Sequence, residues 1–201
     1  MSHKSIAMKG KLFLAVAVAT LLLMSCKKDD VVITPQPTME YTNLHDSVVR
    51  YAQPPVLFDF DEDGFSDLKF GVILVGDGAL GQNKRQFRVS SGIHSKLAVN
   101  TLEQVPVMSI GDSIPLSNFN GYEWWLVSSV IMVERVENTA GQVWWQGHWQ
   151  GAVKKYLPFQ MIKNEHRYNG WVELTVNVQE GKIVLHRLAM SKVPEKVIKA
   201  G

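Results

Sequence analysis

A strict alternation in residues 171–178 predicts β-structure. The segment reads WVELTVNV, with Trp, Glu, Thr and Asn at its odd positions and Val or Leu at its even positions. Successive side chains of a β-strand point to opposite faces, so this period of two creates one aliphatic face that has to pack on a core. The next residues, QEGKIVLHRLAM, place Glu180 and Gly181 before a second apolar run, which predicts a hairpin.

Short runs rich in Val, Ile and aromatic residues recur along the chain, separated by Gly, Asn and Pro. Residues 123–137, EWWLVSSVIMVERVE, are long enough for a helix, but their Val and Ile content favours one long or two short strands. Roughly nine or ten strands in all predict an all-β, antiparallel β-sandwich or jelly-roll-like domain. The other runs are PVLFDF, DLKFGVILV, RQFRVSS, HSKLAVN, VPVMSI, QVWWQGHW, KYLPFQMI and KIVLHRLAM.

The N-terminus predicts export. Residues 1–11 carry three lysines and no acid, and residues 12–24 (LFLAVAVATLLLM) are continuously apolar. Such a run is typical of a signal peptide, and it is shorter than the about 20 residues that a membrane-spanning helix needs. We therefore expect a signal peptide in residues 1–25.

The apolar run ends in LMSC, which resembles the lipobox of bacterial lipoprotein precursors. Cys26 is the only cysteine, so a disulfide within one copy of the chain is impossible. The resemblance implies cleavage before Cys26 and acylation of its sulfur and its new amine, which would anchor the chain to a membrane. The alternative is a cysteine that ends an ordinary secretory signal.

The residues after Cys26 suggest where the anchored protein goes. The sequence CKKDD is similar to the signal that sends some Gram-negative lipoproteins to the outer face of the outer membrane, and the alternative is a charged tether at the periplasmic face. VVITPQPTME contains two prolines and no period, as in an extended linker. We expect a lipoprotein signal peptide (1–25), a lipidated N-terminus with a flexible tether (26–45) and a β-sandwich domain (46–201).

Charge excludes one class of partner. The chain carries 21 basic and 19 acidic residues, and loss of residues 1–25 removes three lysines and no acid, which leaves a net charge of −1. No basic stripe remains to follow a phosphate backbone, so we do not expect nucleic-acid binding.

Residues 58–70, FDFDEDGFSDLKF, predict a metal-binding loop between two strands. Alternate aspartates of a tight loop can turn their carboxylates to one centre, and Gly64 can supply the positive φ where the chain reverses. Hard oxygen ligands in this number suit one calcium ion, and the alternative is an acidic, solvated turn. The expected ligands are four carboxylates and one backbone carbonyl, from Asp59, Asp61, Asp63, Phe65 and Asp67.

The loop and the C-terminal half resemble known patterns. An EF-hand would carry Glu where this chain has Phe70, whereas Asp-x-Asp-x-Asp-Gly-x-x-Asp resembles loops between strands in FG-GAP-type and other extracellular β proteins. KYLPFQMIKNEHRYNGWVELTV and KIVLHRLAMSKVPEKVIKAG resemble a largely uncharacterised family of secreted or anchored bacterial β-domains, although Pro158 replaces a Gly and Val197 a Pro of its pattern. The resemblance implies a fold and a compartment, and no activity.

Tryptophans and histidines are the remaining candidates for residues that bind a ligand or a metal ion. Adjacent residues of a strand face opposite ways, so each Trp pair should put one ring in the core and one outside, where it could stack on a sugar. The alternative is that the rings only pack the core or cover a sheet edge. His94, like the other histidines considered, lacks metal-ligand spacing and is expected at the surface. The candidate ligand-binding residues are Trp124, Trp125, Trp144 and Trp145.

The sequence offers little for catalysis. It has no GxSxG or HExxH motif, and no thiol remains once Cys26 is acylated. We expect a non-enzymatic, calcium-stabilised surface lipoprotein that binds a glycan or a protein, and the alternative is a polysaccharide-active enzyme on the same scaffold. Its carboxylate pair would come from Glu123, Glu134, Glu137, Glu165 and Glu173, none of which the spacing selects.

Overall fold

The computed structural model describes residues 37–201; the expected signal peptide, Cys26 and the first part of the tether lie outside them. Within that range the chain is all-β and contains no helix. Its strands are β1 (Met39–Arg50), β2 (Val56–Phe58), β3 (Leu68–Asp77), β4 (Gln82–Ser91), β5 (Ser95–Asn100), β6 (Ser113–Ile114), β7 (Tyr122–Leu126), β8 (Ser129–Asn138), β9 (Val143–Gln146), β10 (Lys155–Lys163), β11 (His166–Asn177), β12 (Lys182–Ser191) and β13 (Ile198–Lys199).

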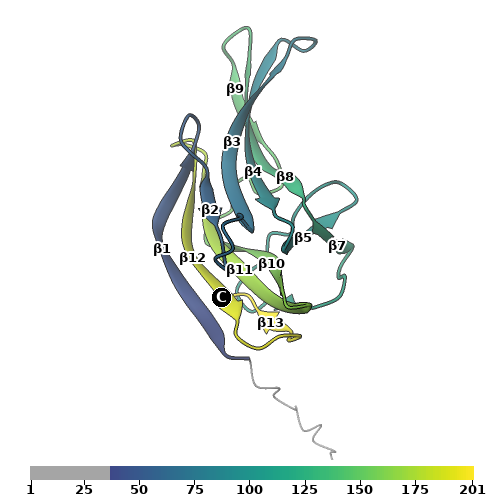
Figure 1. Cartoon of the computed structure of the whole chain (residues 1–201). Helices are drawn as coiled ribbons and strands as arrows, with labels where there is room; N and C mark the ends of the chain where they lie inside the picture. The colour runs from purple at the N-terminus through teal and green to yellow at the C-terminus, as the bar shows by residue number, and fades with distance from the viewer. Residues whose placement is uncertain (1–36) are drawn as a thin grey trace, which may run out of the picture. The chain divides into compact units, whose positions relative to one another are not determined.

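Two antiparallel sheets form the body of the domain (Figure 1). One has the order β1-β12-β11-β10-β5-β7 and the other the order β2-β3-β4-β8-β9. Both sheets contribute to the main hydrophobic core, so the predicted antiparallel sandwich is confirmed. Its members include Phe70, Phe87 and Val133 from the five-stranded sheet and Leu97, Phe159, Leu174 and Leu185 from the six-stranded sheet.

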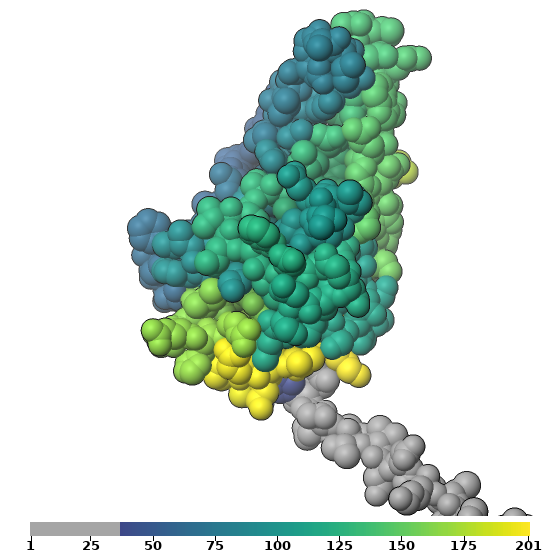
Figure 2. All heavy atoms as spheres, turned by 90° about the vertical axis from the view of Figure 1, so that its right-hand side faces the viewer, coloured from purple at the N-terminus to yellow at the C-terminus, as the bar shows by residue number. Residues whose placement is uncertain are grey.

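The five-stranded sheet extends past its partner at one end. Figure 1 shows β3, β4, β8 and β9 rising beyond the ends of β1 and β12, and Figure 2 shows the same hairpins as the tapering top of the molecule. The six-stranded sheet therefore leaves the inner face of these four strands uncovered at their projecting ends.

The alternating segment forms most of β11, and the predicted hairpin with β12 is confirmed. Val172, Leu174 and Val176 enter the main core as expected. The other face is also buried at Trp171, because a small sheet of β6 and β13 covers it and forms a second hydrophobic cluster. That cluster consists of Met108, Ile114, Tyr156, Trp171, Ala189, Ile198 and Ala200.

Three sequence predictions need correction or refinement. The tether was expected to reach residue 45, which is wrong, because β1 begins at Met39 and pairs with β12 from there. VPVMSI was expected to be a strand, but it makes only an isolated bridge through Met108. Residues 123–137 form two strands, β7 and β8, which separate at Val127 where φ is 49°.

Candidate functional site

The aspartate loop joins β2 to β3, which are antiparallel neighbours as expected. The Asp67 N–H donates to the Phe58 carbonyl (2.7 Å), and the Phe60 N–H donates to the Asp67 carboxylate (2.7 Å). The ring of Phe60 stacks on the fully buried ring of Phe159, with centroids 5.0 Å apart. The loop is therefore attached to the main core by an aromatic contact and two short hydrogen bonds.

Within the loop, carboxylates accept hydrogen bonds from the backbone where the chain reverses. The Gly64 N–H donates to Asp59 Oδ2 (2.9 Å) and the Phe65 N–H donates to Asp63 Oδ1 (2.8 Å). Gly64 has a φ of 86°, the left-handed conformation expected of it. The side chains of Glu62 and Phe65 are exposed, so neither packs against the domain.

The chain crosses from one sheet to the other directly beside this loop. The Gly92 N–H donates to the Asp67 carbonyl (2.8 Å), and the Ser95 hydroxyl donates to the same carbonyl. A Cβ atom on Gly92 would lie 2.4 Å from the Ser66 carbonyl oxygen, so only glycine allows this approach. The crossing places His94 next to the loop, which sequence spacing did not indicate because 27 positions separate it from Asp67.

Two groups of side chains in the loop could hold a metal ion. One oxygen each of Asp59, Asp61 and Asp67 lies within 4.8 Å of the others. Asp61, Asp63 and His94 form a second such group, in which His94 Nδ1 is 3.1 Å from Asp63 Oδ2. The structure thus places the four predicted carboxylates in two overlapping groups that share Asp61, and adds His94 to one of them.

Burial and the neighbouring carboxylates make the ionised form of Asp67 unfavourable. Asp67 is only 3% exposed, and burial is the main reason why its pKa is raised. The Phe60 N–H lowers that pKa, whereas the carboxylates of Asp61, Asp59 and Asp63 raise it further. Asp61 Oδ1 is buried without a hydrogen-bond partner among residues 37–201. A hard cation would satisfy that oxygen and relieve the repulsion.

Each tryptophan pair consists of one exposed ring and one partly buried ring. Trp125 is 56% exposed and Trp144 is exposed to a lesser degree. Trp124 packs against the second hydrophobic cluster, and Trp145 packs against the main core with its ring 5.6 Å from that of Phe87. Trp125 is thus the most exposed ring of the four, and Trp145, although packed on the core, also borders a cavity.

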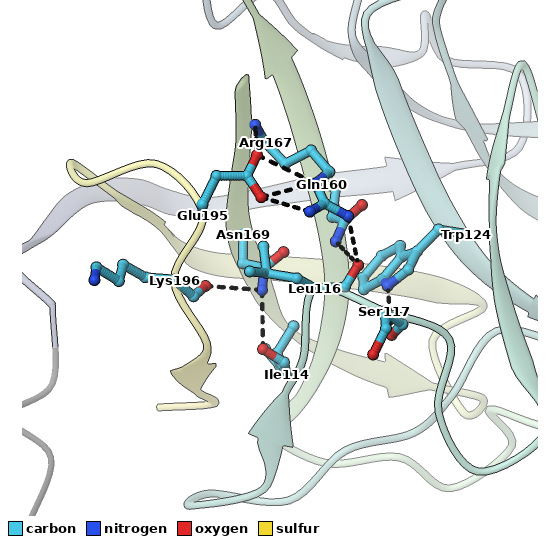
Figure 3. A network of polar contacts seen from close by, with 9 residues as sticks. All are labelled: Ile114, Leu116, Ser117, Trp124, Gln160, Arg167, Asn169, Glu195 and Lys196. Atoms are coloured by element: carbon cyan, nitrogen blue, oxygen red, sulfur yellow. Dashed lines mark hydrogen bonds and ion pairs between the residues drawn. The ribbon is translucent and has the colours of Figure 1, made fainter. Parts of the chain in front are cut away.

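A polar network fixes the backbone beneath the first pair (Figure 3). The Arg167 guanidinium forms a bidentate pair with the Glu195 carboxylate, and the backbone N–H of Arg167 donates to the same carboxylate (2.9 Å). The buried Asn169 amide donates to the carbonyls of Ile114 (2.9 Å) and Lys196 (3.1 Å). These contacts attach the segments that carry β6 and β13 to β11.

The same network continues to Trp124. Arg167 and Gln160 both donate to the Leu116 carbonyl, at 3.3 and 3.0 Å. The Trp124 indole N–H donates to the Ser117 carbonyl (3.2 Å), as Figure 3 shows. Since this indole is fixed, Trp124 has a structural role, and the next tryptophan is held on the opposite face of β7.

Trp125 lines a groove of about 390 Å³ between the ends of β5 and β7 and the start of β8. Its ring is the one aromatic surface among mainly polar neighbours. Those neighbours include Asn100, Thr101, Glu103, Glu123, Ser128 and Ser129.

The glutamates considered as a catalytic pair are dispersed, and only one of the five lines this groove. Glu123 does so together with Glu103, which no sequence pattern singled out. Glu173, by contrast, is buried and paired with Arg187. The four that do not line it are Glu134, Glu137, Glu165 and Glu173.

No family model, curated protein or solved structure matches the chain. Among residues 37–201 there is also no helix long and apolar enough to cross a membrane.

Proposed function

We propose that this protein is a non-enzymatic, glycan-binding lipoprotein of the bacterial cell surface, stabilised by one calcium ion. The observation that supports glycan binding is the Trp125 ring, more than half exposed in a groove with polar walls. A sugar has an apolar C–H face that stacks on an aromatic ring and hydroxyls that need hydrogen-bond partners. The groove offers both kinds of contact side by side.

Rigidity at the groove supports the same proposal. Trp125 belongs to β7, which pairs with β5 along its whole length. The preceding residue, Trp124, is fixed by its hydrogen bond to Ser117 and by packing against Phe119. Binding therefore requires little ordering of the protein, and preorganisation of this kind increases affinity.

Replacement of Trp125 by alanine tests the groove. The chain without its signal peptide and Cys26, residues 27–201, should bind at least one oligosaccharide on a broad glycan array. Trp125→Ala should weaken that binding by about tenfold or more, because the stacking surface is lost. Trp144→Ala, which removes the exposed ring of the other pair, is the matched control and should bind as the unmodified chain does. Equal binding by all three proteins would refute the role of Trp125.

Calcium is the ion we assign to the loop. The group of Asp59, Asp61 and Asp67 consists of oxygen donors alone, which hard cations prefer. Calcium accepts six to eight oxygens in flexible geometry, whereas magnesium demands a small octahedron and keeps its water. Its role here would be structural, since the loop is attached to Phe159 in the core.

Anchoring through Cys26 accounts for the predicted signal peptide and lipobox. Cys26→Ala should release the protein from membranes or stall it as the uncleaved precursor, because the acylated sulfur is lost. Partition of the variant into detergent, compared with that of the native chain, measures the effect, and unchanged partition would contradict lipidation.

Surface display is a separate prediction from the sequence CKKDD. Protease added to intact cells should degrade the native chain, and Lys28→Ala combined with Asp29→Ala should protect it if CKKDD directs surface display.

One observation favours a second candidate, a polysaccharide-active enzyme. Glu103 and Glu123 line the groove that contains Trp125, and glycoside hydrolysis uses two carboxylates on either side of the scissile bond. The assay is the release of reducing ends from a glycan that binds. Release that is lost in Glu123→Gln while binding is retained would establish the enzyme, whereas binding without release supports the proposed binding function.

A further inference from the structure

A second cavity opens at the end of the sandwich where the five-stranded sheet extends past its partner. Its volume is about 530 Å³. One side is formed by Arg50 and Tyr51 at the end of β1 and by the turn between β11 and β12. The other side is formed by β4, β8 and β9, whose upper ends project in Figure 1.

A row of cationic and aromatic side chains lies across the inner face of these three strands. Arg85 on β4 is directly opposite Arg135 on β8, which in turn is directly opposite Trp145 on β9. Phe87, two residues from Arg85 and on the same face of β4, is buried in the core. The two arginines therefore extend the core face of the sheet into the cavity, where a sandwich would ordinarily be apolar.

The arrangement is costly for the protein alone. Like charges directly opposite each other on adjacent strands are destabilising. Three arginines, Arg50, Arg85 and Arg135, line the cavity, and Glu180 is the one carboxylate among its lining residues. Glu137 accepts a hydrogen bond from Arg135 (2.8 Å), and Glu180 lies 2.7 Å from Lys182 Nζ but 4.0 Å from the nearest nitrogen of Arg50.

Arg85 retains its hydrogen-bonding capacity. Its guanidinium stacks over the Tyr51 ring, 4.6 Å from the centroid, which fixes the plane of the group. Among the described residues it donates to no protein acceptor. A guanidinium held by its face presents a planar edge of N–H donors, which matches two oxygens of a carboxylate or a sulfate.

We propose that this cavity binds the carboxylate or sulfate group of an acidic glycan, with Arg85 as the principal donor and Arg50 and Arg135 completing the cationic wall. The site is separate from the Trp125 groove and rests on the proposed function only in the choice of a glycan as the ligand. It adds a charge requirement that the groove alone does not impose.

The position of the cavity favours a ligand in the medium over a lipid headgroup of the anchoring membrane. The chain joins the domain at Met39, and the cavity lies at the other end of β1, beside Arg50. Met39 pairs with Ser191 and Arg50 with Lys182, so at about 3.3 Å per residue along β12 these ends are at most roughly 30 Å apart. The described chain therefore enters the domain at the end of the strand remote from the arginines.

Binding of matched oligosaccharides to residues 27–201 tests the proposal. The probes are oligogalacturonate, a sulfated heparin-derived oligosaccharide, a neutral oligosaccharide of similar length, and anionic phospholipid vesicles. At least one acidic oligosaccharide should bind, and Arg85→Gln should weaken it by about tenfold or more, as expected when a charge-assisted bidentate contact is lost. Arg85→Lys, which keeps the charge and loses the planar fork, should also weaken binding.

Lys163→Gln is the matched control, because it removes one positive charge at an exposed position outside the cavity. Its affinity should equal that of the native chain, and an equal loss in Lys163→Gln and Arg85→Gln would reduce the effect to non-specific charge and overturn the proposal. Absence of binding by both acidic probes, or Arg85-dependent binding of the vesicles alone, would overturn it as well. Arg85→Gln should melt no lower than the native chain, since the variant relieves the repulsion by Arg135.

The two proposed sites can fail separately. If neutral glycans bind through Trp125 and acidic groups add no affinity, the proposal for the groove stands and the proposal for the arginine site fails. If the binding of acidic glycans depends on Arg85 but not on Trp125, the proposal for the arginine site stands and the proposal for the groove fails.

Discussion

Saturating calcium should raise the melting temperature of residues 27–201 by about 5–10 °C relative to the same protein in chelator. An ion that binds only the folded chain adds about 2.7 kcal/mol at roughly 100 times its Kd. Each kcal/mol shifts the melting temperature of a domain of this size by roughly 2–4 °C. Calorimetric melts in millimolar calcium and in chelator make the comparison, and identical curves would show that the aspartates form only a turn.

The loop supplies a matched pair of variants. Asp61 carries the buried oxygen without a partner, so Asp61→Asn should abolish the calcium response. It should not destabilise the metal-free protein, because the repulsion with Asp59 and Asp67 decreases. Glu62→Gln removes a carboxylate from an exposed position in the same loop and should leave the response intact. Loss of the response in both variants would mean that the net charge of the loop matters and a defined site does not.

The pH dependence has a definite sign. In the metal-free protein the pKa of Asp67 is raised, chiefly by burial. A group with a raised folded-state pKa contributes stability below its unfolded pKa, and this contribution is lost as the pH rises through the folded pKa. Calcium requires the ionised carboxylate, so its stabilising increment should be larger at about pH 7 than at about pH 4.5. An increment independent of pH would argue against Asp67 as a ligand.

Local patterns predicted the features that depend on neighbours in sequence. The alternation of β11, the turn before β12 and the positive φ of Gly64 all follow from the geometry of one or two strands. The same geometry explains why the sequence did not predict β1 as a strand. Most side chains of β1 are exposed, so it carries no clear apolar alternation, and its ladder is interrupted between Asn43 and Ser47.

Features that depend on register between distant strands could not be predicted. Arg85 and Arg135 are 50 positions apart and meet only because β4 pairs with β8 in one register. Glu103 and Glu123 share a groove because the chain between β5 and β7 folds back on itself. Trp171 looked like part of a polar face, yet it is fully buried, because the short strands β6 and β13 cover it. Neither of those strands is long enough to leave a periodic signal.

Trp149 lies outside the two tryptophan pairs, and it is fully buried in the main core. Its indole N–H donates to the Val105 carbonyl (3.3 Å), and its backbone N–H donates to the Met132 carbonyl (3.1 Å). It thereby attaches two segments without strand pairing of their own, the turn after β9 and the residues after β5, to the centre of the sandwich. Loss of this side chain should affect the whole domain.

Trp149→Ala should therefore lower the free energy of unfolding more than any other substitution proposed for this protein, by about 3–5 kcal/mol. The loss comes from the transfer energy of the buried side chain and from the void that its removal leaves. At roughly 2–4 °C per kcal/mol, the melting temperature should fall by roughly 6–20 °C. Trp149→Phe keeps most of the ring and loses the indole donor, so its fall should be smaller. Trp125→Ala removes an equally large but exposed side chain and should melt within about 2 °C of the native chain. A small shift for Trp149→Ala, or a large one for Trp125→Ala, would contradict the division of these two tryptophans into a core residue and a binding surface.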